Sequence, residues 1–245
     1  MKKLIFALII IGSALTVNAK ENLPADFSRA NDLYAKEQYG QAIALYDGLL
    51  EQSGPDAAVY FNLGNSYYKT QKYGKAMLSF ERALRLKPRD SDIRFNADFV
   101  RTLVKEPPEN FPESAVSALN GLVTLNELTL LCSGLFLLLI IAIAFYTLSR
   151  NQTALLLCVI SSTALIVFSG WLLLKADKEA LSREAIIVSG PADVRNGPGE
   201  ENSVGFTLPE GRKVMILGAK DSWTAIGLKT EGLKGWLENK YLEEI

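Results

Sequence analysis

Two long, uncharged apolar stretches constrain the fold of this chain more than any other feature. They run from Leu128 to Leu148 and from Ala154 to Leu174. At 1.5 Å per residue, a helix of either length crosses the hydrocarbon core of a bilayer, which is about 30 Å thick. The short polar segment Ser149-Arg150-Asn151-Gln152 joins them. The sequence therefore predicts two transmembrane helices (128–148 and 154–174) in a tight antiparallel hairpin.

This hairpin has the composition of an anchor. Neither stretch contains Asp, Glu, Lys, Arg or His, so neither offers an obvious ion or proton pathway. Small residues that allow close helix packing occur in both, namely Ser133, Gly134, Ser161, Ser162, Ser169 and Gly170. The two cysteines, Cys132 and Cys158, would lie about 15–20 Å apart in an antiparallel hairpin, too far for a disulfide. We interpret them as small packing residues.

The segment from Met1 to Ala19 has the layout of a signal peptide. Lysines precede the apolar run from Leu4 to Leu15, and small residues follow it up to Ala19. An uncleaved membrane anchor is the alternative. Either segment exports the chain after it, and the hairpin returns the chain to the same side. We therefore expect a bacterial inner (cytoplasmic) membrane protein with both soluble modules in the periplasm, although the basic residues around 175–183 favour the opposite orientation.

A sequence repeat organises the N-terminal part. YYKTQKYGKA at Tyr67–Ala76 echoes LYAKEQYGQA at Leu33–Ala42, with each residue 34 positions after its counterpart. The second copy resembles the tetratricopeptide repeat at all eight signature positions, which are Tyr60, Leu63, Gly64, Tyr67, Ala76, Phe80, Ala83 and Pro88. The small residues allow two helices to cross closely, and the aromatic residues fill the space between repeats. We expect an all-α solenoid over residues 24–104.

The repeat pattern also predicts where the modules begin and end. We place the repeats at about 24–54 and 57–90, with a capping helix at 91–104. A Pro-rich linker with a short interfacial helix follows at 105–127. The first repeat is less regular, because Asp26 and Arg29 stand where apolar residues are expected. Two repeats plus a cap are close to the minimum for a stable stack.

The resemblance implies a groove for protein segments, lined by the first helix of each repeat. The corresponding positions here are Phe27, Asn31, Tyr34, Phe61, Asn62, Asn65, Tyr68, Phe95, Asn96 and Phe99. Clamping of a C-terminal carboxylate, one mode of this family, requires lysines where this chain has phenylalanines. We therefore expect an apolar, hydrogen-bonding groove for a helical or extended segment. In the alternative, the rings pack against neighbouring helices, or the linker helix fills the groove.

Residues 185–245 have a different periodicity. Short runs rich in Val, Ile and Trp alternate with Gly and Pro, which predicts five or six strands in a small all-β barrel. The order of motifs, including Pro209-Glu210-Gly211 as a turn, resembles the bacterial SH3-like domain. That resemblance makes Arg195, Asn196 and Trp223 candidates for a binding edge. In the alternative, both tryptophans of the module are core residues and Arg195 is a surface residue.

Composition excludes several classes of function. The chain has no histidine, and neither cysteine lies outside the predicted spans, so we expect no metal site, no cofactor and no enzymatic activity. Residues 20–113 carry 13 basic and 14 acidic groups, and residues 175–245 carry 10 and 12. Without a basic stripe, nucleic acid is not an expected partner.

The order of these parts resembles the BatE-type family of the bacterial aerotolerance operon. That resemblance implies a periplasm-facing, membrane-anchored interaction scaffold that acts with von Willebrand A domain membrane proteins in aerotolerance or envelope stress. A second hypothesis is an adaptor that binds peptidoglycan peptides through the SH3-like module and recruits a hydrolase. Retention on isolated cell wall would distinguish them. The sequence names neither the bound segment nor the oligomeric state.

Overall fold

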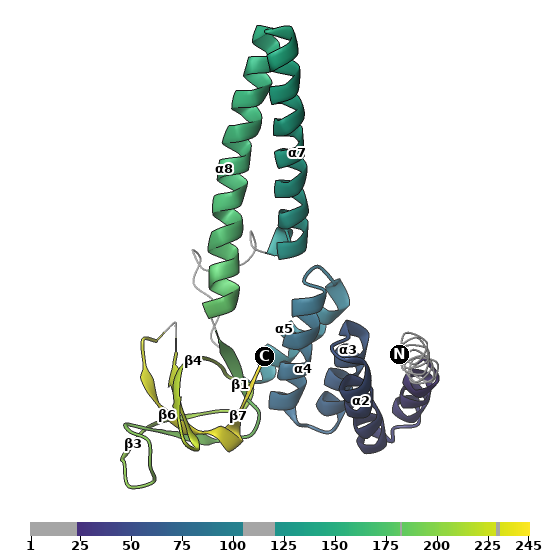
Figure 1. Cartoon of the computed structure of the whole chain (residues 1–245). Helices are drawn as coiled ribbons and strands as arrows, with labels where there is room; N and C mark the ends of the chain where they lie inside the picture. Colours follow the sequence, from purple (N-terminus) through teal and green to yellow (C-terminus); the bar gives the residue numbers. More distant parts are fainter. Residues whose placement is uncertain (1–23, 105–120, 182, 229–230) are drawn as a thin grey trace, which may run out of the picture. The chain divides into compact units, whose positions relative to one another are not determined.

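The computed structural model describes residues 24–104, 121–181, 183–228 and 231–245 (Figure 1). It divides into two compact units. The helix–sheet unit combines the N-terminal helices with the sheet that begins at Glu184, and the hairpin unit contains the helices between them. The predicted signal peptide (1–19) and most of the predicted linker (105–127) lie outside the described residues.

Five helices lie in the described N-terminal part of the helix–sheet unit, residues 24–104. The first spans residues 24–35. It is followed by α2 (Tyr39–Ser53), α3 (Ala57–Lys69), α4 (Tyr73–Leu86) and α5 (Ser91–Leu103). Side chains of Asp56 and Asp90 cap α3 and α5, accepting bonds from backbone N–H groups of the first turn.

The turn between the two helices has the same backbone conformation and the same hydrogen bond in both repeats. Glu37 and its counterpart in the second repeat, Gln71, both adopt left-handed backbone with φ of 60° and 59°. The next backbone N–H closes each turn: Gln38 donates to Leu33 at 2.9 Å, and Lys72 donates to Tyr67 at 2.9 Å. The two helical pairs are therefore two copies of one structural unit, as the repeat in the sequence predicts.

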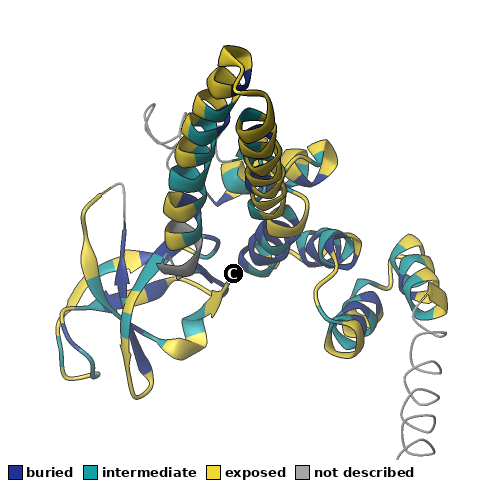
Figure 2. Cartoon of the chain, turned by 45° about the horizontal axis from the view of Figure 1, so that its top comes forward, coloured by how far each residue is buried: buried dark blue, intermediate teal, exposed yellow. Residues whose placement is uncertain are grey.

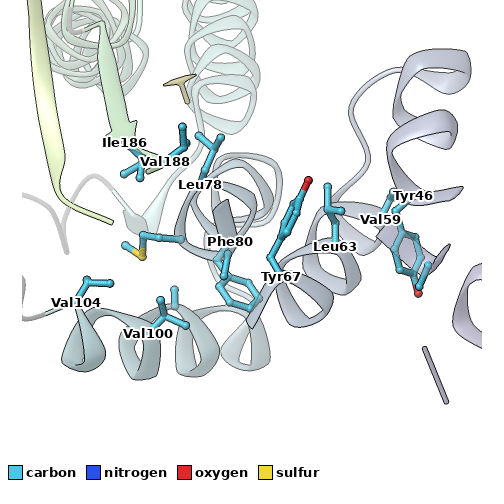
Figure 3. Packing of buried hydrophobic residues seen from close by; sticks show 14 of the residues in the cluster. Tyr46, Val59, Leu63, Tyr67, Leu78, Phe80, Val100, Val104, Ile186 and Val188 are labelled. Atoms are coloured by element: carbon cyan, nitrogen blue, oxygen red, sulfur yellow. The ribbon is translucent and has the colours of Figure 1, made fainter. Parts of the chain in front are cut away.

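Small residues set the helix crossings inside a repeat. Ala42 and Ala76 are fully buried, and a Cβ atom built on Gly64 would lie 2.7 Å from the Phe80 ring. Any larger residue would push α3 away from α4. The resulting core continues through Tyr46, Leu63 and Val100, as Figure 3 shows.

The C-terminal residues form one antiparallel sheet of seven short strands. They are β1 (Glu184–Ile187), β2 (Ala192–Arg195), β3 (Val204–Leu208), β4 (Lys213–Lys220), β5 (Trp223–Gly227), β6 (Lys234–Glu238) and β7 (Leu242–Glu244), with a 3-10 turn at Asn239–Tyr241. Their order is β3-β2-β6-β5-β4-β1-β7. The expected barrel is therefore corrected: among the described strands, β3 and β7 each pair on one side only, so the sheet is not closed and has two edges. Gly211 adopts φ of 80°, as the predicted turn requires.

The sheet packs directly on the last helices of the repeat stack. Ile186 and Val188 join the same buried cluster as the α4 residues Met77 and Leu78 (Figure 3). Contact is close enough that a Cβ built on Gly74 of α4 would lie 2.5 Å from the Ile187 carbonyl oxygen. The repeat core thus extends to Ile186 and Val188 at the base of the sheet, while the sheet has a second core of its own.

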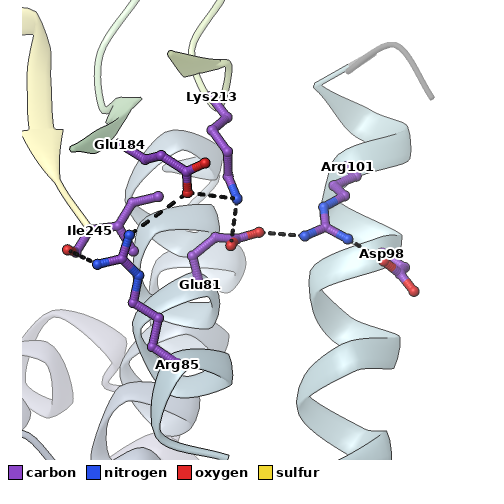
Figure 4. Close-up of polar contacts among 7 residues, drawn as sticks. All are labelled: Glu81, Arg85, Asp98, Arg101, Glu184, Lys213 and Ile245. Carbon is purple, nitrogen blue, oxygen red and sulfur yellow. Dashed lines mark hydrogen bonds and ion pairs between the residues drawn. The ribbon is translucent and has the colours of Figure 1, made fainter. Parts of the chain in front are cut away.

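A buried charge cluster crosses the same boundary (Figure 4). The Glu81 carboxylate on α4 accepts a bond from Lys213 Nζ of β4 at 2.9 Å and another from Arg101 of α5. Arg101 also pairs with Asp98 at 2.6 Å. Because its partners must be in place for a buried carboxylate to stay ionised, Glu81 fixes how the sheet sits on α4 and α5.

The hairpin unit consists of α7 (Leu125–Ser149) and α8 (Gln152–Leu181), which pack antiparallel. Both extend beyond the predicted spans and are long and apolar enough to cross a membrane. Their outer surfaces are mostly exposed apolar residues (Figure 2). Thr124 and Glu127 form a capping box at the start of α7, and Lys175 Nζ donates to the Val123 carbonyl at 2.6 Å.

Candidate binding surfaces

The first helices of the repeats present the residues that the sequence assigns to a groove. We call the surface formed by residues 24–35, α3 and α5 the first-helix face. Phe27 and Phe61 do not stack on each other here. Each packs on an aromatic ring of the second helix in its own repeat: Phe27 on Tyr46 with centroids 6.2 Å apart, and Phe61 on Phe80 at 6.0 Å. Both phenylalanines are half-buried, so they support the stack as well as the face.

The asparagines of this face bond to one another. Asn62 Nδ2 donates to Asn31 Oδ1 at 2.9 Å, and Asn96 Nδ2 donates to Asn65 Oδ1 at 2.8 Å. Both pairs have the same separation in the sequence, so the same bond joins each first helix to the next. Tyr46 also donates to Asn31 Oδ1, at 2.6 Å. These four amides form an interhelix ladder, and their remaining donors and acceptors line the face beside it.

An exposed apolar strip ends the first-helix face. Phe95, Phe99 and Leu103 follow one another at four-residue spacing on α5, and they are 72 %, 46 % and 42 % exposed. We call these three residues the α5 strip. The Phe99 ring meets Tyr68 of α3 edge-on with centroids 5.7 Å apart, so the strip continues onto the neighbouring helix. Three large apolar side chains exposed together on one helix are unusual for a water-exposed surface.

Leu103 of this strip is absent from the sequence-derived set of groove positions. The residue 34 positions earlier is Lys69, so the repeat alignment gives no sign of an apolar residue here. The signal that could have revealed it is the i, i+4, i+8 pattern of Phe95, Phe99 and Leu103 within one helix.

Three tyrosines of the repeats have raised pKa values and support the fold rather than any acid–base chemistry. Burial raises the pKa of Tyr46 and of Tyr67 to about 12, and burial also raises the pKa of Tyr34, whose ring meets Tyr39 edge-on at 5.3 Å. All three hydroxyls therefore remain protonated over the physiological range. Within the described residues, no three His, Cys, Asp or Glu side chains gather as a metal site.

The three candidates for a binding edge on the sheet have different environments. Trp223 is only 8 % exposed. Arg195 is half-buried, and its Nη1 donates to the carbonyls of Glu200 at 3.0 Å and Asn202 at 2.7 Å. Asn196 is exposed, with its amide donating to Ser203 Oγ at 2.9 Å. Arg195 and Asn196 therefore brace the loop between β2 and β3, whereas Trp223 packs inside the module.

A comparison with protein-family models supports the helical repeat in the N-terminal part of the chain. A tetratricopeptide-repeat family model matches residues 27–91. A comparison with curated proteins finds no match. Several solved structures are similar at low identity. The type III secretion chaperone SycD of Yersinia enterocolitica, in complex with a peptide of the translocator YopD, is 18 % identical, covering 64 % of this chain and 95 % of that chain with a TM-score of 0.33.

Two further structures have comparable similarity. YrrB, described as a TPR protein with an unusual peptide-binding site, is 20 % identical over 68 % of this chain and 90 % of that chain, with a TM-score of 0.36. A chain of the CopN-Scc3 complex is 21 % identical over 35 % of this chain, with a TM-score of 0.34; the match spans about half of it, 51 %. The family match supports tetratricopeptide repeats in the N-terminal helices.

Proposed function

We propose that this protein is a membrane-anchored interaction scaffold that binds partner segments on its first-helix face. The observation that carries the proposal is the α5 strip, an exposed apolar surface beside a row of amides. Apolar side chains of a partner would cover Phe95 and Phe99, and its polar groups would bond to the asparagines. A segment with apolar residues at helical or alternating spacing fits this combination.

The anchoring part of the proposal rests on the hairpin unit. Both of its helices pass the length and composition test for a membrane span, and few of their apolar side chains are buried within the unit. Lipid would cover these side chains. The export signal expected in residues 1–19 would place the repeats and the sheet on the periplasmic side of the inner membrane.

The resemblance to the BatE-type family supplies the physiological setting that we propose. Von Willebrand A domain membrane proteins would be the partners, in aerotolerance or envelope stress. The C-terminal sheet would serve as an SH3-like module of this scaffold. Because Ile186 and Val188 of the sheet side pack into the repeat core, we expect the two to act as one receptor.

Photo-crosslinking tests the binding face. A benzoylphenylalanine replacing Phe95 should form a covalent product with another protein of the same membrane, because this side chain is 72 % exposed within the proposed contact. The product should decrease at least fivefold when Phe99→Ser is added. The measurement is crosslinking in intact cells, followed by mass spectrometry of the product.

The control places the same crosslinker at Ala44, an exposed position on α2. Equal yields at positions 95 and 44, or a product that Phe99→Ser leaves unchanged, would contradict binding at the α5 strip. Phe61→Ala is unsuitable as a test, because Phe61 packs on Phe80 and its loss would disturb the fold.

Reporter fusions test the orientation. An enzyme that is active only in the periplasm should be active when fused after Ile245 and inactive when fused after Arg150, in the turn between α7 and α8. The reason is that two spans return the chain to its starting side. Activity at Arg150 and none at Ile245 would reverse the proposed topology while leaving the anchor intact.

A further inference from the structure

One edge of the sheet is open. Strand β3 pairs with β2 through Ala192–Leu208, Asp193–Thr207 and Val194–Phe206, and no strand follows on its other side among the described residues. Within the same part of the chain, no backbone group elsewhere bonds to the residues from Gly205 to Leu208. Figure 1 shows β3 at the outer margin of the sheet. The outward N–H and C=O groups of this strand are therefore available to another strand.

The opposite edge of the sheet, strand β7, is covered by side chains of α4. Strand β7 is short, and α4 closes its outer side: Arg82 donates to the Glu244 carbonyl, and Arg85 Nη1 donates to the Ile245 carbonyl at 2.8 Å. Arg82 also lies 3.9 Å from the Glu243 carboxylate. Arginines of α4 thus cover one edge of the sheet, whereas no described segment covers the other.

The sequence of β3 suits the addition of a strand. It reads Val-Gly-Phe-Thr-Leu, without the charges and prolines that usually block an edge. Its inward residues hold it in place, since Leu208 is buried and Phe206 packs against the sheet core. On the other face of β3, Gly205 has no side chain and Thr207 donates to Asp193 Oδ1 at 2.8 Å, so neither residue places a bulky side chain over the edge.

Acidic residues flank this edge at both ends. Glu200 and Glu201 precede β3, Glu210 follows it, and the side chains of the first two are exposed. Neither Glu200 nor Glu210 has a cationic partner within the described parts of the chain. The nearby Arg195 points its guanidinium at loop carbonyls instead. The open edge therefore carries negative charge that a partner can neutralise.

We propose that β3 is a docking edge for an extended partner segment with an uncharged, strand-forming centre and basic residues at both ends. Five residues of strand span roughly 17 Å, so about five uncharged residues separate the two basic ends, which lie just beyond the paired region. Main-chain bonds along Val204–Leu208 supply the binding, and the glutamates select the flanks. A second copy of this strand is disfavoured, because antiparallel pairing would bring Glu210 of one copy toward Glu200 and Glu201 of the other.

The test uses the full chain in detergent micelles and two synthetic peptides, Lys-Lys-Val-Thr-Val-Thr-Val-Lys-Lys and its counterpart with glutamate flanks. The lysine-flanked peptide should bind at least tenfold more tightly, measured by fluorescence anisotropy. At saturation, it should slow amide hydrogen exchange in residues 204–208 at least tenfold. Combining Glu200→Lys, Glu201→Lys and Glu210→Lys should invert the preference between the peptides.

Two further peptides separate strand addition from charge attraction alone. Methylation of alternate backbone nitrogens blocks one edge of the peptide, and methylation of the other alternate set blocks the opposite edge. One of these peptides should retain affinity and the other should lose it. Equal binding of both, protection of amides outside 204–208, or no measurable binding of the lysine-flanked peptide would each overturn the proposal. The first-helix face plays no part in this experiment, so its outcome is independent of the proposed function.

Discussion

Replacing Gly74 with alanine should lower the free energy of unfolding of the helix–sheet unit by about 1–3 kcal/mol. An added Cβ would lie 2.5 Å from the Ile187 carbonyl oxygen and 2.9 Å from the Val188 Cα atom. Both neighbours are backbone atoms, which cannot move aside by changing a rotamer. The sheet must shift away from α4 and loosen the cluster around Leu78. Thermal unfolding of the purified chain measures the effect, and limited proteolysis between repeats and sheet locates it.

The repeat supplies a matched control for this substitution. Gly40 occupies the same position of the first repeat, in α2, and a Cβ built there would have nothing within 4 Å. Because alanine restricts the unfolded chain more than glycine does, Gly40→Ala should stabilise by about 0.4–1 kcal/mol. If Gly74→Ala proved as harmless as Gly40→Ala, the sheet would not rest on α4 in solution.

The repeat and the hairpin are the parts of the fold that sequence predicts well. The helices follow from local signals: a constant offset between the two repeat copies, small residues at Ala42 and Ala76, and two apolar runs without charges. Each of these features acts within one helix or between neighbouring helices, so a linear pattern captures it. The helix itself is longer than the predicted span, because α8 continues beyond Leu174 as far as Leu181.

The docking of the sheet on α4 is not predictable in the same way. It joins residues far apart in the sequence, and the glycine that permits it has an identical counterpart, Gly40, against which no described element packs. One weak sequence signal for the docking of the sheet is Leu78, a large apolar residue where the first repeat has Ala44. In the structure Leu78 is 3 % exposed, whereas Ala44 on α2 is exposed. An apolar residue on the outer face of a repeat helix indicates that something covers it.

The candidate site shows a similar limit. The sequence assigns Asn31, Asn62, Asn65 and Asn96 to one face, but it does not reveal that they bond in pairs. That bond depends on the stagger between stacked helices, which a linear pattern does not contain. The closed barrel also failed as a prediction, because strand content and turn motifs say little about whether β3 finds a second neighbour.

Replacing Glu81 with glutamine should cost the helix–sheet unit about 2–5 kcal/mol at pH 7. The loss should be toward the lower end, because the Arg101 and Lys213 side chains retain 35 % and 30 % exposure. Burial opposes ionisation of Glu81, but Lys213 and Arg101 outweigh it and lower the pKa of this carboxyl below its usual 4.5. Denaturant unfolding of the single variant, of Lys213→Gln and of the double variant would give the coupling energy directly.

The pH dependence of unfolding shows whether Glu81→Gln destabilises by losing the ion pairs of Glu81 or by disturbing packing in general. A carboxyl with a lowered pKa contributes stability above pH 4.5 and loses it as the pH falls through 4.5 toward the lowered value. The deficit of Glu81→Gln should therefore shrink on acidification.

Asp47, the residue 34 positions earlier, provides the opposite case. Burial raises the pKa of Asp47 above its usual 3.8, and this exceeds the opposing effects of Lys75 and of the Tyr67 hydroxyl. Such a group stabilises the fold only when protonated, and that contribution is lost as the pH rises through the raised pKa. Asp47→Asn should therefore leave stability at pH 7 unchanged or increased. The two residues share one position of the repeat. A loss of unfolding free energy at pH 7 in both variants would mean that this position matters for helix packing. A loss in Glu81→Gln alone would assign the effect to the contact between Glu81 and the sheet.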